Sequence, residues 1–154
     1  MKSAIGIIAG LAFGLAGVSP AFAWHLVPES TSFTGAGKTS ATVNGITLKC
    51  SASLTGHTDS KGIGYIDSGS FTGQPGCTAV TFQNTPWTST AVSGSTVHIA
   101  NVTFSTPIGN CGPSTLTVRL GRAGTFTWKN QVLSGGCNIS GTITTSPAIT
   151  IAKN

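Results

Sequence analysis

The chain has 154 residues and only 7% of them are charged, with eight Lys and Arg against three Asp and Glu for a formal net charge of +5. A chain of this length typically forms one domain with its own core. The positive residues are scattered singly, which argues against a nucleic-acid-binding face, because such a face needs clustered Lys and Arg. Three acidic residues leave little material for a catalytic centre, so the composition favours a protein that is not an enzyme.

The first 23 residues have the pattern of a signal peptide. Lys2 gives a positive start, an uncharged apolar run extends from Ala4 to Val18, and Ala21-Phe22-Ala23 matches a small-x-small cleavage site. The apolar run is shorter than the ~20 residues of a membrane-spanning helix. We therefore expect residues 1–23 to be removed and residues 24–154 to form a single domain. The product would be exported through the periplasm and secreted, with no transmembrane segment left after cleavage.

After an extended leading segment at 24–31 and a short strand near Phe33, the clearest strand covers residues 46–54. Its apolar residues occupy every second position, which buries one face of a strand and leaves the other in water; they are Ile46, Leu48, Cys50, Ala52 and Leu54. Asn44-Gly45 precedes this strand and predicts a tight hairpin turn, because both residues readily adopt positive φ.

Further strands are expected at 63–72, 77–83, 87–92, 96–105, 116–120, 126–129, 137–143 and 149–151. Within 96–105 the alternation changes phase near Ala100-Asn101, which predicts a β-bulge. Roughly eight to ten short strands with regular turns and no helical stretch indicate an all-β domain, specifically an antiparallel β-sandwich of the immunoglobulin-like or jelly-roll-like kind. A closed β-barrel is the alternative.

The four cysteines, Cys50, Cys77, Cys111 and Cys137, accompany an export signal, so we expect two disulfides. Three pairings can be drawn. We expect Cys50–Cys77 and Cys111–Cys137, because each of these pairs lies in neighbouring stretches of the chain. The long, irregular spacings contain no C-x-x-C motif, which argues against a zinc site and against thiol redox chemistry.

The most suggestive polar motif is His57-Thr58-Asp59, with Asp67 further along the chain. It has too few carboxylates for a calcium loop, so we interpret it as a polar turn. The sequence contains no Gly-x-Ser-x-Gly nucleophile elbow, and His98 has no evident acidic partner. We therefore predict no catalytic residue, no cofactor and no metal ligand.

Apolar side chains in and after the leading segment form the candidate interaction surface: Trp24, Leu26, Val27 and Phe33. An exposed tryptophan at a new N-terminus suits insertion at an interface or docking on a neighbouring subunit. Trp87 and Trp128 are interpreted as core residues.

Four stretches are familiar in combination: Ser32–Gly37, Ile46–Cys50, Thr106–Pro113 and Gly136–Ile151. With the signal peptide and the length, they make the chain resemble the bacterial secreted proteins called protein activator of alkane oxidation. The resemblance covers nearly all of residues 24–154, and its motifs are structural rather than catalytic. It implies an extracellular accessory protein that promotes growth on long-chain alkanes, with a hydrocarbon surface or the cell envelope as its partner.

Two other functions are open from the sequence. The leading segment could add as a strand to the sheet of the next subunit, which would give a self-associating fibre or biofilm-matrix protein. The sandwich and its tryptophans are also compatible with a carbohydrate-binding module.

Overall fold

The structure is a computed structural model, and it describes residues 23–154. The signal peptide expected at 1–23 therefore lies outside the described residues except for Ala23. Within the described part of the chain, no helix combines the length and hydropathy needed to cross a membrane.

Residues 23–154 form eleven strands and one short 3₁₀ helix, η1 (Cys77–Ala79). The strands are β1 (Trp24–Val27), β2 (Ser32–Val43), β3 (Ile46–Thr58), β4 (Gly64–Gly73), β5 (Thr81–Gln83), β6 (Trp87–Ala91), β7 (Thr96–Thr106), β8 (Gly109–Leu120), β9 (Thr125–Leu133), β10 (Cys137–Ser146) and β11 (Thr150–Lys153).

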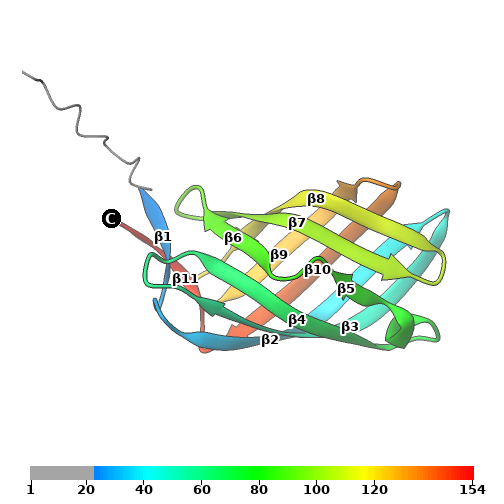
Figure 1. Cartoon of the computed structure of the whole chain (residues 1–154), viewed down its shortest axis with the longest axis horizontal. Helices are drawn as coiled ribbons and strands as arrows, with labels where there is room; N and C mark the ends of the chain where they lie inside the picture. Colours follow the sequence, from blue (N-terminus) through cyan, green and yellow to red (C-terminus); the bar gives the residue numbers. More distant parts are fainter. Residues whose placement is uncertain (1–22) are drawn as a thin grey trace, which may run out of the picture.

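Eight of these strands form a closed antiparallel barrel in the order β2-β3-β4-β6-β7-β8-β9-β10, with β10 pairing back onto β2 (Figure 1). Strand β5 pairs with the second half of β7, so β5 and β6 share one position in the wall, one after the other. Strands β1 and β11 form a separate antiparallel pair at one end of the barrel.

The all-β class is confirmed, and of the two architectures the closed barrel is observed, so the sandwich that we preferred is wrong. The deciding contact is the long-range ladder between β10 and β2, which joins the last strand of the barrel to the first. Inward and outward residues alternate in the same way along the strands of a sandwich and of a barrel, so the local pattern does not distinguish them.

Small residues face inward opposite large ones, which lets a narrow barrel fill with side chains. A Cβ atom built on Gly141 would lie 2.5 Å from the Trp128 ring, and one on Gly35 would lie 2.9 Å from a Leu54 methyl group. The large side chains therefore occupy the space above these glycines.

The local predictions of turn and bulge are confirmed. Asn44 and Gly45 have φ values of 50° and 77° and connect β2 to β3. The register between β7 and β8 shifts between Ile99 and Val102, where the bulge was expected.

Both expected disulfides are present. Cys50 in β3 joins Cys77 in η1, and Cys111 in β8 joins Cys137 in β10. The first therefore ties η1 to the barrel wall, and the second crosses the end of the barrel that carries the β2–β3, β7–β8 and β9–β10 turns. We call this end the hairpin end.

Candidate functional site

The leading segment is largely built into the fold. Leu26 is 1% exposed and Phe33 is 8% exposed, so the surface contact expected of these two residues does not hold: both pack in the core, because β1 and β2 deliver them to the barrel interior. Trp24 and Val27 are half-buried. The Trp24 ring lies against Gly94, with Lys153 Nζ 5.9 Å from its centroid.

Strand β1 already has partners within its own chain. It pairs with β11 over Trp24–Val27, and the Leu26 N–H donates a 2.9 Å hydrogen bond to the Gly62 carbonyl on the other side. Adding β1 to another subunit's sheet would require these contacts to break.

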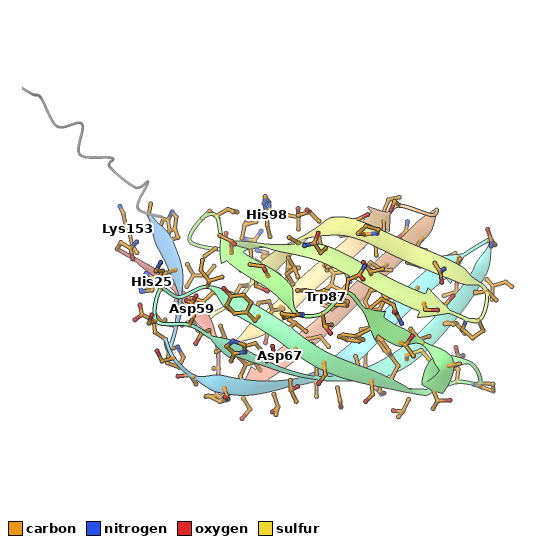
Figure 2. The ribbon with its side chains drawn as sticks, in the orientation of Figure 1. His25, Asp59, Asp67, Trp87, His98 and Lys153 are labelled. Carbon is orange, nitrogen blue, oxygen red and sulfur yellow. A yellow bond between two sulfur atoms is a disulfide. The ribbon has the colours of Figure 1, made fainter. Side chains whose placement is uncertain are left out.

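The polar motif around His57 is a cross-strand cluster on the outer wall. His57 Nδ1 lies 2.7 Å from Asp67 Oδ2, and its ring stacks on Tyr65 with centroids 5.0 Å apart. The Tyr65 hydroxyl donates to Asp59 Oδ2 at 3.4 Å. His25, Asp59 and Asp67 all lie toward the β1 end of the barrel (Figure 2).

Asp59 stabilises the loop between β3 and β4. Its carboxylate accepts hydrogen bonds of 2.9 Å from the backbone N–H groups of Lys61 and Ile63. Burial alone would raise the pKa of Asp59, but these hydrogen bonds, the Tyr65 hydroxyl and the Lys61 charge together lower it below its ordinary value. Asp59 thus lies in a well-bonded turn, whereas His57 and Asp67 lie in β3 and β4, so the polar turn interpreted from the sequence holds for Asp59 alone.

Two other histidines lie apart from this cluster. His25 Nε2 contacts Glu29 Oε1 at 3.3 Å, and His98 points outward from β7 (Figure 2). Within residues 23–154, no group of three or more His, Cys, Asp or Glu is placed to hold a metal ion.

The outer wall is covered mainly by hydroxyl groups. One row of outward-facing residues runs across five neighbouring strands and consists of Thr125, Thr144, Ala36, Ser53 and Ser70. Its hydroxyls partly bond to one another, as Thr125 and Thr144 do at 3.3 Å. The next row contains two positive charges, Lys38 and Arg119. Lys38 Nζ donates a hydrogen bond to Ser51 Oγ at 2.6 Å.

Exposed large apolar side chains occur at both ends of the barrel. Ile46 is 51% exposed and Val132 is 71% exposed, and the register places both at the hairpin end, on neighbouring rows of β3 and β9. Val92, 45% exposed, lies at the opposite end in the turn between β6 and β7.

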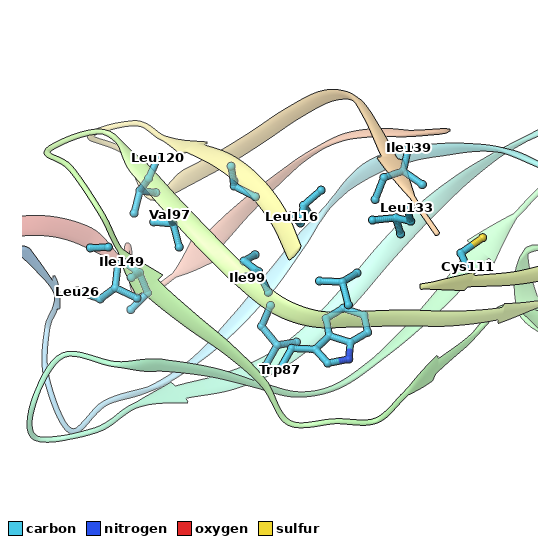
Figure 3. Packing of buried hydrophobic residues seen from close by; sticks show 14 of the residues in the cluster. Leu26, Trp87, Val97, Ile99, Cys111, Leu116, Leu120, Leu133, Ile139 and Ile149 are labelled. Atoms are coloured by element: carbon cyan, nitrogen blue, oxygen red, sulfur yellow. The ribbon is translucent and has the colours of Figure 1, made fainter. Parts of the chain in front are cut away.

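The barrel interior is apolar and contains a cavity of about 110 Å³. Its lining extends along the barrel, from Leu26 and Ile149 at the β1 end to Cys111 and Ile139 at the hairpin end (Figure 3). Trp87 and Trp128 both line it, so they face inward as expected; Trp87 is buried and Trp128 is half-buried.

The wall of this cavity has an interruption between β4 and β5, which we call the seam. The β4–β6 ladder stops at Ile66–Trp87, and no hydrogen bond among the described residues joins the rest of β4 to β5. The Phe82 ring fills the space instead. It stacks on Trp87 with centroids 4.6 Å apart, and a Cβ on Gly69 would lie 2.3 Å from it.

The comparison with known protein families gives a match over residues 1–153 to the model described as alkane oxidation protein activator PraA/PraB-like. The chain belongs to this family. No curated protein and no solved structure matched the chain.

Membership in the PraA/PraB-like family confirms the resemblance drawn from the sequence. The family is described as an activator of alkane oxidation and not as a catalyst, which agrees with a non-enzymatic accessory role.

Sequence reasoning missed the cavity and the seam of this PraA/PraB-like barrel. The inward-facing glycines Gly35 and Gly141 give no signal for the cavity, because large side chains fill the space above them. The seam had no signal either, because it depends on which strands meet when the barrel closes.

Proposed function

We propose that the protein is exported and promotes alkane oxidation, without catalysing it, by adsorbing at the boundary between hydrocarbon and water. The observation that carries this proposal is the distribution of side chains: a hydroxyl-rich wall of low charge, with exposed apolar residues at the hairpin end. The family membership supplies the link to alkanes.

The low charge of the wall reduces the cost of approaching an apolar phase. Taking a charged group out of water is far more costly than moving a hydroxyl that keeps a hydrogen-bond partner. Wall hydroxyls such as Thr125 and Thr144, or Thr55 and Ser68 at 2.8 Å, hold partners within the protein.

Ile46 and Val132 give the molecule a preferred orientation at such a boundary. Both lie at the hairpin end, whereas the acidic residues Asp59 and Asp67 lie toward the opposite end. Moving exposed apolar area from water to hydrocarbon is favourable at roughly 25 cal/mol per Å². We therefore expect the hairpin end to face the hydrocarbon.

The disulfides support a location outside the cytoplasm. All four cysteines form two disulfide bonds. Such bonds persist in oxidising compartments such as the periplasm and the extracellular space. A barrel closed on itself also leaves few sheet edges exposed, which limits aggregation at an interface.

The test is the interfacial tension of a hexadecane–buffer boundary, measured by pendant drop against protein concentration. The protein should lower the tension clearly more than a bland secreted β-sandwich of similar size. Replacing both apolar residues of the hairpin end (Ile46→Ser with Val132→Ser) should remove most of that difference. The matched control is Val92→Ser at the other end, which should retain it. A wild-type effect no larger than the bland protein's would contradict the proposal.

A further inference from the structure

The structure contains a second apolar feature that adsorption at a boundary does not use, namely the cavity inside the barrel. Its volume of about 110 Å³ is somewhat below that of an apolar cavity of ~150 Å³, which stays dry and binds benzene or xenon. The residues that line it extend along the barrel, from Leu26 at one end to Cys111 at the other. Because this lining is apolar and follows the length of the barrel, an unbranched alkyl chain suits it better than a compact ring.

Side chains that are almost fully buried occupy both ends of the barrel. At the β1 end, Leu26 and Ile149 are 1% and 0% exposed. At the hairpin end, Val43 and the Cys111–Cys137 disulfide are buried to a similar degree. Entry through the wall would leave these buried contacts in place.

The backbone ladder between neighbouring strands is short or absent at two places in the wall. Among the described residues, only one of these places has no hydrogen bond between its strands. Between β8 and β9 the ladder is short, but side chains bridge the gap: the Thr117 N–H donates to Gln131 Oε1 at 3.3 Å, and the Ser134 N–H donates to Ser114 Oγ at 2.8 Å. At the seam between β4 and β5, by contrast, the closing contact is the half-buried Phe82 ring, which packs over Gly69. The ring also contacts the rings of Trp87, Phe71 and Phe104. An aromatic ring can rotate aside without breaking a backbone hydrogen bond.

The geometry points to a binding site for a single unbranched alkyl chain inside the barrel, entered through the seam with Phe82 as its gate. The inference rests on the proposed function only for the choice of an alkyl ligand. The chain would occupy the cavity between Trp87 and Trp128, while its end leaves the barrel beside Phe82. The protein would then take up one hydrocarbon chain per molecule in addition to coating a droplet.

The experiment titrates the purified protein, with both disulfides formed, with 1-bromoalkanes of increasing length dissolved below their solubility limits. Bromine quenches tryptophan fluorescence on contact, and Trp87 and Trp128 both line the cavity. Trp24 lies outside it, so the Trp24→Phe variant serves as the parent protein. We expect saturable quenching with one site per molecule and competition by n-hexane. Affinity should rise about fourfold per added methylene until the cavity is full, and then level off.

Two alanines on the same strand give a matched pair of variants. Ala41 faces the cavity and Ala36 faces outward from β2. Ala41→Leu should weaken binding by roughly tenfold or more, because its three added carbons occupy space that the ligand needs. Ala36→Leu should leave the affinity unchanged. If Ala41→Leu does not fold, as judged by circular dichroism, Ala52→Val places a smaller addition in the same cavity.

Three results would overturn the inference: no saturable quenching, equal effects of Ala41→Leu and Ala36→Leu, or an affinity that keeps rising with chain length without limit. Phe82→Ala tests the gate separately and should raise the association and dissociation rates by about tenfold or more with a smaller change in affinity. Unchanged rates would exclude entry at the seam. Ala41→Leu should lower interfacial tension as well as wild type does, so failure of the cavity site and failure of adsorption are distinguishable.

Discussion

The Cys50–Cys77 disulfide offers the sharpest test of how the barrel wall is held together. It joins β3 to η1, and η1 leads directly into β5 and the seam. Cys77 is fully buried, and its cluster includes Cys50 and Phe71. Replacing both cysteines with alanine removes the covalent link while leaving the strands of the barrel unchanged.

The expected cost follows from the length of the closed loop. The two cysteines are 27 residues apart in sequence. In the chain-entropy model, a loop of this size corresponds to about 3.6 kcal/mol of stability at 25 °C. For a domain of about 130 residues, an unfolding entropy of roughly 2.1 cal/mol/K per residue converts this cost into a fall in Tm of about 13 °C.

The Cys111–Cys137 disulfide is the matched control, because its separation of 26 residues predicts nearly the same cost. Thermal and urea unfolding should therefore give similar losses of stability for the two double-alanine variants. Only the Cys50/Cys77 variant should loosen the seam. Acrylamide quenching of Trp87 fluorescence, measured in a protein from which the other two tryptophans have been removed, would detect this loosening. A fall in Tm below about 3 °C, or seam loosening in both variants alike, would refute this reasoning.

Two further predictions concern single side chains. In a urea titration, Gly141→Ala should lower the free energy of unfolding by about 1–3 kcal/mol, because the new Cβ meets the Trp128 ring at 2.5 Å. The control is Gly121→Ala, whose new Cβ has its nearest atom 3.7 Å away and should have little effect. The lowered pKa of Asp59 means that its carboxylate stabilises the fold fully above the unfolded pKa of about 3.9, and that this contribution is lost as pH falls through the lower folded pKa. Wild type should therefore lose stability below about pH 4 more steeply than Asp59→Asn; parallel curves would show that the loop hydrogen bonds do not favour the charged form.

Local features of the fold could be predicted because they depend on neighbouring residues. The strand at 46–54 is the first part of β3, Asn44-Gly45 forms its hairpin turn, and the phase change near Asn101 marks the bulge in β7. The pairing of the cysteines followed from sequence proximity in the same way.

The closure of the sheet could not be predicted, because it depends on one long-range ladder. Strand β10 pairs with β2 across about a hundred residues, whereas the β7–β8 ladder is a hairpin between consecutive strands. The burial of Leu26 and Phe33 in the barrel interior depends on this closure as well. A leading segment is expected to make few contacts unless something ties it down, and here β11 and the barrel interior do so.

The central claim is that the protein promotes alkane oxidation physically, at the hydrocarbon boundary. The most direct test is the rate of hexadecane consumption by cells from which the gene for this protein has been deleted, with and without added protein. We predict a clear acceleration when hexadecane is supplied as a separate layer, and none when it is supplied as a stable emulsion of fixed droplet area. Equal acceleration in both formats would contradict the account, because the protein would then act on a step that follows contact between cell and hydrocarbon.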